Sequence, residues 1–462
     1  MDSVQVVDVT ARRIANKLTP ICSLPSELLA KIFKLGQNIQ WEDNELDASP
    51  TSQLVADHSF GILVTHVSSH FREVAIGTPQ LWSDITISSC MSRAELETCL
   101  TRTGGCALDV RIEAGLSVPL DPLIMVQIEI IIVHSKRYRQ LVINCVSESS
   151  AQSVVPRFSK VAMPDLKHLS IAIGTAEGLF PHDGRMPFSA EMPYLSFVRL
   201  RGLALMLFCL PLQNVTTLHL DQTVFTPILY STFRRMIISS SALQNLSLYG
   251  DLFSPVTTPL TTLEVGDPID IPKLRCLRIS GVGGELYSGI LRGIIADSLT
   301  SIVLKNLKQY DLQPFMASPF SSIKFPLLRE LVLIDPDMTS DEYTQLFYTF
   351  PTTTSFAIYH RETADILRLL AEDPADGFIP WPELNTLSVL VDENDDDVVA
   401  KIVERRRAIG CPLEKMRLGT TELLTSMPHF SWLQEHVIME TFVTFGAWPD
   451  ADSKDGEDTL FQ

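Results

Sequence analysis

A short apolar pattern recurs along most of the chain and constrains its fold more than any other feature. The pattern is apolar-x-x-apolar-x-apolar, often with a proline two residues before the first apolar position. Clear copies are MPDLKHLSI (163–171), MPYLSFVRL (192–200), IPKLRCLRI (271–279), FPLLRELVL (325–333) and WPELNTLSV (381–389). Weaker copies begin at 106, 137, 213, 241, 297, 351 and 411. Because period-2 alternation is typical of a short strand, the pattern predicts twelve strands.

The spacing of the copies predicts how these strands assemble. Their first apolar positions are Ala107, Tyr138, Leu166, Leu195, Val215, Leu243, Leu274, Leu299, Leu328, Thr353, Leu384 and Leu413. The mean spacing of about 28 residues falls within the range of leucine-rich repeats. A unit of this size cannot bury its apolar face alone, so neighbours must stack into a curved solenoid.

The stretches between copies have helical character, as in 121–135, 226–240, 340–350 and 395–410. An ordinary α/β domain, with parallel strands and crossover helices, is the alternative. No strand copy is followed by a glycine-rich phosphate-binding turn, however, and the copies keep one form. We therefore predict an α/β fold in which residues 91–435 form an irregular leucine-rich-repeat solenoid of about twelve repeats.

A different segment, residues 19–90, precedes the repeats. LPSELLAKIFKLG (24–36) predicts an amphipathic helix with proline in its first turn. ILVTHVSSHFREVAIG (62–77) predicts a second helix, and TPQLW (78–82) leads into a strand that starts the solenoid. The acidic, polar stretch 37–59 predicts a loop or insertion between the two helices.

This segment resembles the F-box-like domain of mushroom-type fungal proteins. The residues that match its first half are Leu24, Pro25, Glu27, Leu28, Leu29, Ile32 and Phe33. Those that match its second half are Val67, Phe71, Arg72, Ala75, Thr78, Pro79, Leu81 and Trp82. Phe71 stands where the family mostly has Trp, and Ser68-Ser69-His70 replaces the usual Cys-Arg-Arg. The likeness continues diffusely to about residue 420, through HSKRYRQLVI (134–143) and VERRRAIGCPLEKMRL (403–418).

The resemblance implies a substrate receptor of an SCF-type cullin-RING ubiquitin ligase, with the repeats holding a target protein. The side chains that it implies for binding the Skp-family adaptor, and through it the cullin, are Leu24, Pro25, Glu27, Leu28, Leu29, Ile32, Phe33, Val64, Val67, Phe71, Leu81 and Trp82. The alternative is a repeat scaffold without ubiquitin chemistry, in which the segment only caps the solenoid. Adaptor binding needs the apolar residues of both helices exposed, whereas capping buries them.

Charge and hydropathy exclude other classes of function. The 37 Lys and Arg against 55 Asp and Glu give a net charge of −18, the wrong sign for binding nucleic acid. We find no signal peptide and no apolar run of membrane-spanning length, so we expect no membrane association and a cytoplasmic or nuclear location.

Candidate catalytic and metal-binding motifs have simpler explanations. His66 and His70 have a metal-ligand spacing but no third ligand in view. One expected helix has the acidic run 392–397 at its N-terminus and Arg405 to Arg407 near its C-terminus, where the helix dipole favours each charge. We find no catalytic motif and no Cys-x-x-Cys pair among the eight cysteines, and we expect no enzymatic activity, metal or cofactor.

Basic residues recur beside the third apolar position of several copies. Because side chains alternate along a strand, these positions face the inside of the solenoid. Arg199, Arg201, His219, Arg278 and Lys305 therefore predict a mildly basic strip that binds an acidic or phosphorylated target segment. The alternative is that they are solvated strand residues. The acidic segment 447–462 is expected to be disordered.

Overall fold

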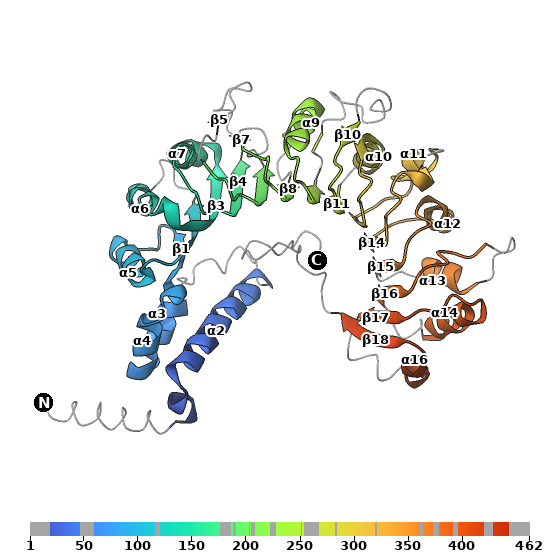
Figure 1. The fold of residues 1–462 in the computed structure, drawn as a ribbon, viewed down its shortest axis with the longest axis horizontal. Helices are drawn as coiled ribbons and strands as arrows, with labels where there is room; N and C mark the ends of the chain where they lie inside the picture. The colour runs from blue at the N-terminus through green and yellow to red at the C-terminus, as the bar shows by residue number, and fades with distance from the viewer. Residues whose placement is uncertain are drawn as a thin grey trace, which may run out of the picture. The chain divides into compact units, whose positions relative to one another are not determined.

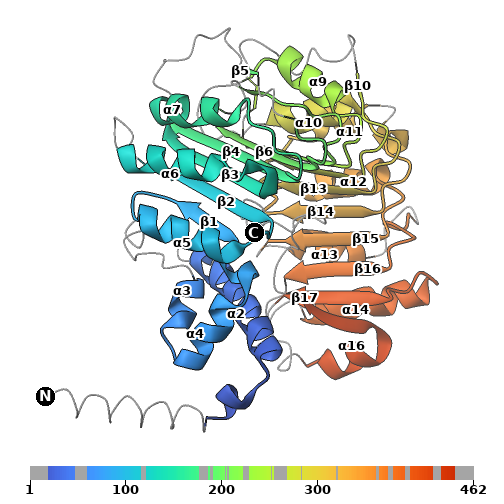
Figure 2. The same ribbon diagram turned by 60° about the vertical axis from the view of Figure 1, so that its left-hand side comes forward.

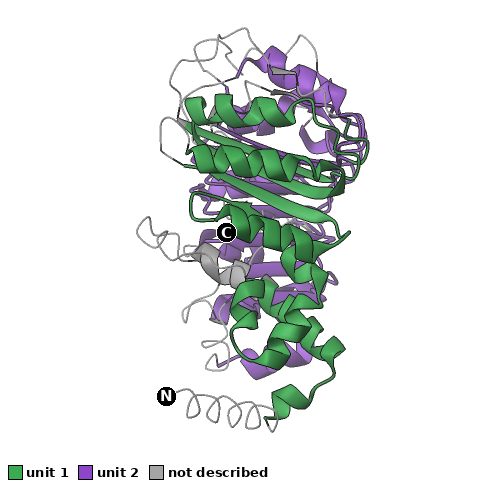
Figure 3. Ribbon diagram, turned by 90° about the vertical axis from the view of Figure 1, so that its left-hand side faces the viewer, with its two compact units in different colours: residues 1–194 green, residues 195–462 purple. Residues whose placement is uncertain are grey.

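A computed structural model of the chain divides into two compact units, residues 1–194 and 195–462 (Figure 3). The structure describes residues 19–46, 60–115, 121–175, 186–187, 191–202, 204, 208–221, 228–250, 252–253, 268–281, 284–318, 321–360, 364–372, 378–390, 396–419 and 428–442. The predicted disorder of 447–462 lies outside these residues.

Unit 1 combines N-terminal helices with a parallel sheet. Its helices are η1 (Pro20–Ser23), α2 (Ser26–Leu46), α3 (Phe60–Thr65), α4 (Ser69–Ile76), η2 (Pro79–Trp82), α5 (Arg93–Thr103), α6 (Pro122–Ile132), η3 (Ser135–Arg137) and α7 (Glu148–Phe158). The strands β1 (Asp84–Ile87), β2 (Leu108–Ala114), β3 (Tyr138–Ser147) and β4 (His168–Thr175) pair in sequence order.

Unit 2 continues the same alternation. Its main strands, all paired in parallel and in sequence order, are β6 (Phe197–Gly202), β8 (Thr217–Asp221), β9 (Asn245–Tyr249), β11 (Cys276–Ser280), β13 (Ser301–Lys305), β14 (Glu330–Ile334), β15 (Ser355–Tyr359), β16 (Thr386–Leu390), β17 (Lys415–Gly419) and β18 (Ile438–Phe442). Its helices are α9 (Tyr230–Ser239), α10 (Gly284–Gly293), α11 (Gln313–Met316), η5 (Ser321–Ile323), α12 (Ser340–Thr349), α13 (Ala364–Ala371), α14 (Asp396–Ala408) and α16 (Phe430–His436). The described helices of unit 2 lie on one side of its strand row (Figures 1 and 2).

Each of the twelve predicted copies contains a strand, and two further strands extend the series. β1 is the strand expected after residue 82, whereas β18 lies beyond the predicted end of the repeats at 435. Eleven of the twelve first apolar positions are buried. The exception is Ala107, which is exposed because the register shifts at the start of β2 and places Leu108 opposite Tyr138.

The same backbone turn precedes many strands and explains the recurring pattern. In the copy before β11, the Leu274 amide donates to the Ile271 carbonyl at 3.0 Å, and both side chains are buried. The proline between them lacks an amide and fits such a turn. Each new strand then attaches to the previous repeat: the Gln244 carbonyl accepts from the amides of Arg275 and Cys276. Neighbouring repeats thus share backbone hydrogen bonds as well as apolar contacts.

Side chains alternate between two faces of the strands of unit 2. The Leu200 row, with Leu220, Leu248, Ile279, Leu304, Leu333, Ile358, Val389 and Leu418, is buried. The opposite face, which we call the inner strand face, has a middle row of Arg199, His219, Ser247, Arg278, Val303, Val332, Ala357, Ser388, Arg417 and Glu440. This alternation places the predicted basic residues on one face, as expected.

The N-terminal helices differ from the sequence prediction in two respects. α2 continues to Leu46, into the stretch 37–59 that was expected to form a loop. The predicted helix 62–77 is instead two helices, because the backbone of Ser68 is extended and its hydroxyl accepts a hydrogen bond from the Phe71 amide at 3.1 Å. Ser68 therefore caps α4 instead of continuing α3.

Arg406 of α14 is an unexpected interior residue of unit 2. The residue is 2% exposed, and its guanidinium donates to the carbonyls of Pro380 at 3.1 Å, Trp381 at 3.0 Å, Leu384 at 3.1 Å and Cys411 at 3.1 Å. Burial lowers the pKa of this guanidinium. The side chain thus ties α14 to the turn before β16.

Candidate functional site

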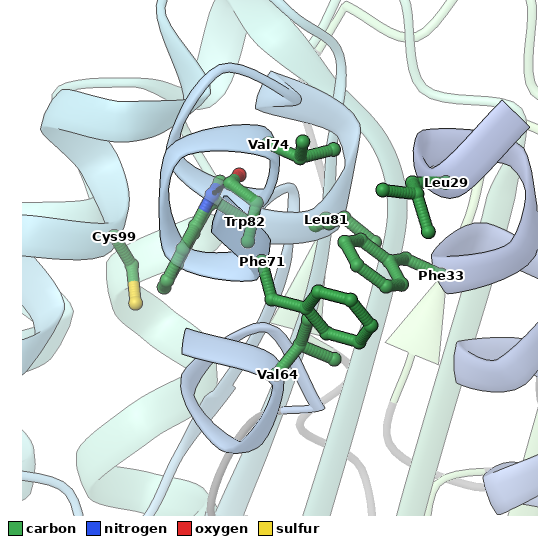
Figure 4. Packing of buried hydrophobic residues seen from close by; sticks show 9 residues of the cluster. Leu29, Phe33, Val64, Phe71, Val74, Leu81, Trp82 and Cys99 are labelled. Carbon is green, nitrogen blue, oxygen red and sulfur yellow. Dashed lines mark hydrogen bonds between the residues drawn. The ribbon is translucent and has the colours of Figure 1, made fainter. Parts of the chain in front are cut away.

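A compact apolar core holds the N-terminal helices together (Figure 4). Leu29 and Phe33 of α2 face α3 and α4, where Val64 and Phe71 are also buried. The Phe33 and Phe71 ring centroids lie 5.1 Å apart at 55°, a tilted arrangement that aromatic pairs favour. α2 and α3 approach so closely that a side chain on Gly36 would meet the Phe60 ring at 2.7 Å. The helices therefore form one module of defined geometry.

Trp82 extends this core into the first strand-and-helix unit. Its indole nitrogen donates to the Ala75 carbonyl at 2.8 Å, and its ring packs in the same cluster as Cys99 of α5. The Arg102 guanidinium lies 4.2 Å from the ring centroid, a cation–π contact. Burial, with a smaller contribution from Glu95, raises the pKa of Cys99 to about 11. The module and α5 thus share one hydrophobic core.

The outer face of α2 is apolar and exposed. Leu28 is 49% exposed, Ile32 44% and Leu35 54%. Their i, i+4, i+7 spacing places them in one stripe along the helix, about a quarter turn from the buried pair Leu29 and Phe33. Three large apolar side chains thus leave about half of their surface in contact with water, on a helix that packs through another face.

A second exposed apolar pair lies at the end of α3. Leu63 is 44% exposed, and Val67 is 62% exposed in the turn before α4. The sequence prediction included Val67 but not Leu63 or Leu35. Ile21 of η1 and Ile76 of α4 are exposed as well. We name the residues of α2 and of the end of α3, Leu28, Ile32, Leu35, Leu63 and Val67, the exposed apolar set of the module.

The structure divides the predicted adaptor-binding residues into two groups. Pro25, Glu27, Leu28, Ile32 and Val67 are exposed and Leu24 is half-buried, so these side chains are accessible. Those that form the core are Leu29, Phe33, Val64, Phe71, Leu81 and Trp82. The second group supports the module from within, because its burial leaves little surface for a partner.

The predicted basic strip is largely buried and neutralised. Arg199 is 3% exposed, and its Nε lies 2.7 Å from Oδ2 of Asp221, which is itself 1% exposed. Nε of the half-buried Arg201 is 3.3 Å from the same oxygen. His219, on the middle row next to Arg199, packs its ring 5.0 Å from Phe197. These residues form an internal ion-paired group rather than a solvated strip.

The rest of the inner strand face is mixed. Arg278 is buried and Lys305 half-buried. Lys415 and Arg417 pair with Glu440 at 2.8 and 3.0 Å. Between these basic residues, the buried side chains Val303, Val332, Ile334 and Ala357 form an apolar cluster of their own, with Tyr359 packed against it. We call this the inner apolar cluster, and the sequence prediction did not include it.

The described residue ranges contain no group of three or more His, Cys, Asp or Glu side chains placed to hold a metal. No helix within them is both long and apolar enough to cross a membrane. Comparisons with models of known families and with curated proteins found no match to this chain. Within the described residues, the exposed apolar set and the inner strand face are candidate interaction surfaces.

Proposed function

We propose that the protein is the substrate-recognition subunit of an SCF-type cullin-RING ubiquitin ligase. Residues 19–90 act as the F-box that docks on the Skp-family adaptor, and the leucine-rich-repeat-like strands and helices hold the target protein. The protein performs no chemistry in this proposal; it raises the concentration of the target beside the ubiquitin-loaded enzyme.

The observation that carries the proposal is the exposed apolar set of the module. Leu28, Ile32 and Leu35 lie outside the core that packs through Leu29 and Phe33, and their exposure keeps apolar area in contact with water. Large apolar side chains exposed along one face of a helix mark interaction sites on proteins. The same side chains include residues of the F-box-like motif, Leu28, Ile32 and Val67.

The second candidate is a scaffold in which the module only caps the repeats. The shared core of Trp82, Cys99 and the Arg102 contact supports a capping role. Capping alone, however, gives no reason for the exposed stripe on α2. The two roles are compatible, since different faces of the module serve them.

A binding measurement with the purified Skp-family adaptor tests the proposal. The test variant is Leu28→Ser/Ile32→Ser/Leu35→Ser in the full chain. Docking would remove the remaining half of each side chain from water, which is worth about 1 kcal/mol each. We expect the dissociation constant to rise by about two orders of magnitude, while the variant stays folded by circular dichroism with a lowered unfolding temperature, because each side chain is also half-buried within the chain.

The matched control is Val133→Ser/Ile323→Ser, which removes two apolar side chains that are at least as exposed but lie outside the module. This control should bind the adaptor as tightly as the wild type. Absence of adaptor binding by the wild type, or equal binding by the α2 variant, would leave the scaffold role as the better account.

A further inference from the structure

One stretch of unit 1 carries a local excess of basic residues. Residues 134–167 contain six Lys or Arg against two acidic residues, Glu148 and Asp165, a local net charge of +4, although the whole chain has a net charge of −18. Glu148 is buried, so its charge is not presented at the surface. The sign of the local charge is therefore opposite to that of the chain. The basic residues are Lys136, Arg137, Arg139, Arg157, Lys160 and Lys167.

The fold brings these residues to the edge of the sheet at which β3 and β4 begin. The two strands are parallel, and the Lys167 amide, just before β4, donates to the Arg139 carbonyl at the start of β3 at 2.9 Å. Lys136 follows α6 and Lys160 follows α7, two neighbouring helices that pack together, so that their axes lie about 8–10 Å apart. All four of these basic residues are exposed. They thus share one accessible edge.

Part of this charge is compensated within the chain. Arg139 pairs with the buried Asp109, its Nε lying 3.0 Å from Oδ1. Arg157 pairs with Glu129 of α6, and Lys167 also interacts within the chain. Three of the six cations are therefore already engaged.

The other three cations keep their charge. Arg137 donates to neutral acceptors, the Cys106 carbonyl at 2.7 Å and the Thr103 hydroxyl at 2.8 Å, so no carboxylate offsets it there. Among the described residues, no carboxylate forms an ion pair with Lys136 or Lys160. The two lysines are thus exposed and uncompensated at the ends of neighbouring helices.

An exposed apolar side chain lies beside these cations. Val133 caps the C-terminus of α6, three residues before Lys136, and is 78% exposed. No other large apolar side chain among the described residues is as exposed. The dipole of α7 favours a cation in its last turn, which accounts for Arg157, but it accounts neither for Lys136 nor for the exposed valine.

We propose that Val133, Lys136, Arg137 and Lys160, which we call the basic edge, bind an acidic peptide segment of the target protein. Carboxylates of the segment contact the two lysines, and an apolar side chain of the segment packs on Val133. An anionic membrane fits less well, because the net charge of −18 repels it and a single valine buries little apolar area. That the segment belongs to a ligase target rests on the proposed function, whereas the binding surface itself does not.

Fluorescence anisotropy with the full chain, without adaptor, tests the proposal. The probe is a labelled Glu-Glu-Asp-Leu-Glu-Glu-Asp peptide at about 100 mM salt, where charges more than about 10 Å apart are largely screened. The wild type should bind this probe but not its Gln and Asn counterpart. Lys136→Glu/Lys160→Glu should weaken binding about tenfold or more, because two attractive contacts become repulsive. The matched control, Lys273→Glu/Lys401→Glu, makes the same charge change at two exposed lysines of unit 2 and should keep the affinity within about twofold.

Three results would overturn the proposal. The first is a wild type that does not distinguish the acidic probe from its amide counterpart, and the second is an equal loss of affinity in the two lysine variants. The third is a wild type that leaves the probe free but sediments with vesicles containing phosphatidylserine, which would assign the edge to a membrane surface. Because no adaptor is present, failure of the ligase role leaves these outcomes unchanged.

Discussion

Arg406→Met should destabilise unit 2 by several kcal/mol, although Arg406 lies in a basic run at the end of α14 where the sequence predicts solvent-exposed side chains. The methionine keeps much of the side-chain volume but removes the donors to the Pro380, Leu384 and Cys411 carbonyls. The Trp381 carbonyl keeps the Leu384 amide as a donor. A buried acceptor without a donor costs about 1 kcal/mol or more, so three give about 3–4 kcal/mol.

The assay is thermal and urea unfolding followed by circular dichroism, with Arg407→Met as the control. Arg407 is the next residue on the same helix and is exposed, so its loss should change stability by less than about 0.5 kcal/mol. For a unit of this size we expect Arg406→Met to lower the unfolding temperature by about 6–14 °C. Equal unfolding temperatures for the two variants would refute the assignment of Arg406 as an interior hydrogen-bond donor.

Three further perturbations probe other parts of the structure. Asp221→Ala leaves Arg199 buried without its carboxylate partner and should cost about 3 kcal/mol in the free energy of unfolding by urea; an unchanged unfolding midpoint would contradict the pairing. Gly36→Val should separate α2 from Phe60 and lower stability by about 1–3 kcal/mol, whereas unchanged stability would mean that the helices do not approach so closely. Because burial raises the pKa of Cys99 to about 11, its thiol should resist iodoacetamide at pH 8 in the native protein, and the stability that its neutral form contributes should be lost as the pH rises from about 9 to about 11; rapid native alkylation would contradict its burial.

The repeat strands could be predicted from sequence because one periodic signal specifies both the strand and its buried face. Each copy combines a turn before the strand, as at Leu274, with alternating apolar residues, and both features are local. The departures have local causes too. A register shift at the start of β2 places Leu108, rather than the predicted Ala107, at the first buried position of that copy. Ser68 interrupts the predicted helix because its hydroxyl caps α4.

The site was harder to predict because burial depends on neighbours that are distant in sequence. Arg199 fits the pattern of an inner-face cation, but the buried Asp221 on the next strand neutralises it. Arg406 belongs to a basic triplet at a helix end, and only the turn before β16 explains why the middle arginine is interior. On α2, the helical pattern alone does not separate Leu28 from Leu29, since which one is buried depends on where α3 and α4 pack.

The shared core around Trp82 affects how the chain can be divided and recombined. A fragment cut at residue 90 would leave Leu81 and Trp82 without Cys99 and Arg102, so the excised helices would expose their largest apolar side chain. A chimera that grafts these helices onto a different repeat array would need to carry α5, through Thr103, with them. The unit that can be exchanged, by an engineer or in gene fusion, therefore ends about a dozen residues later than the motif does.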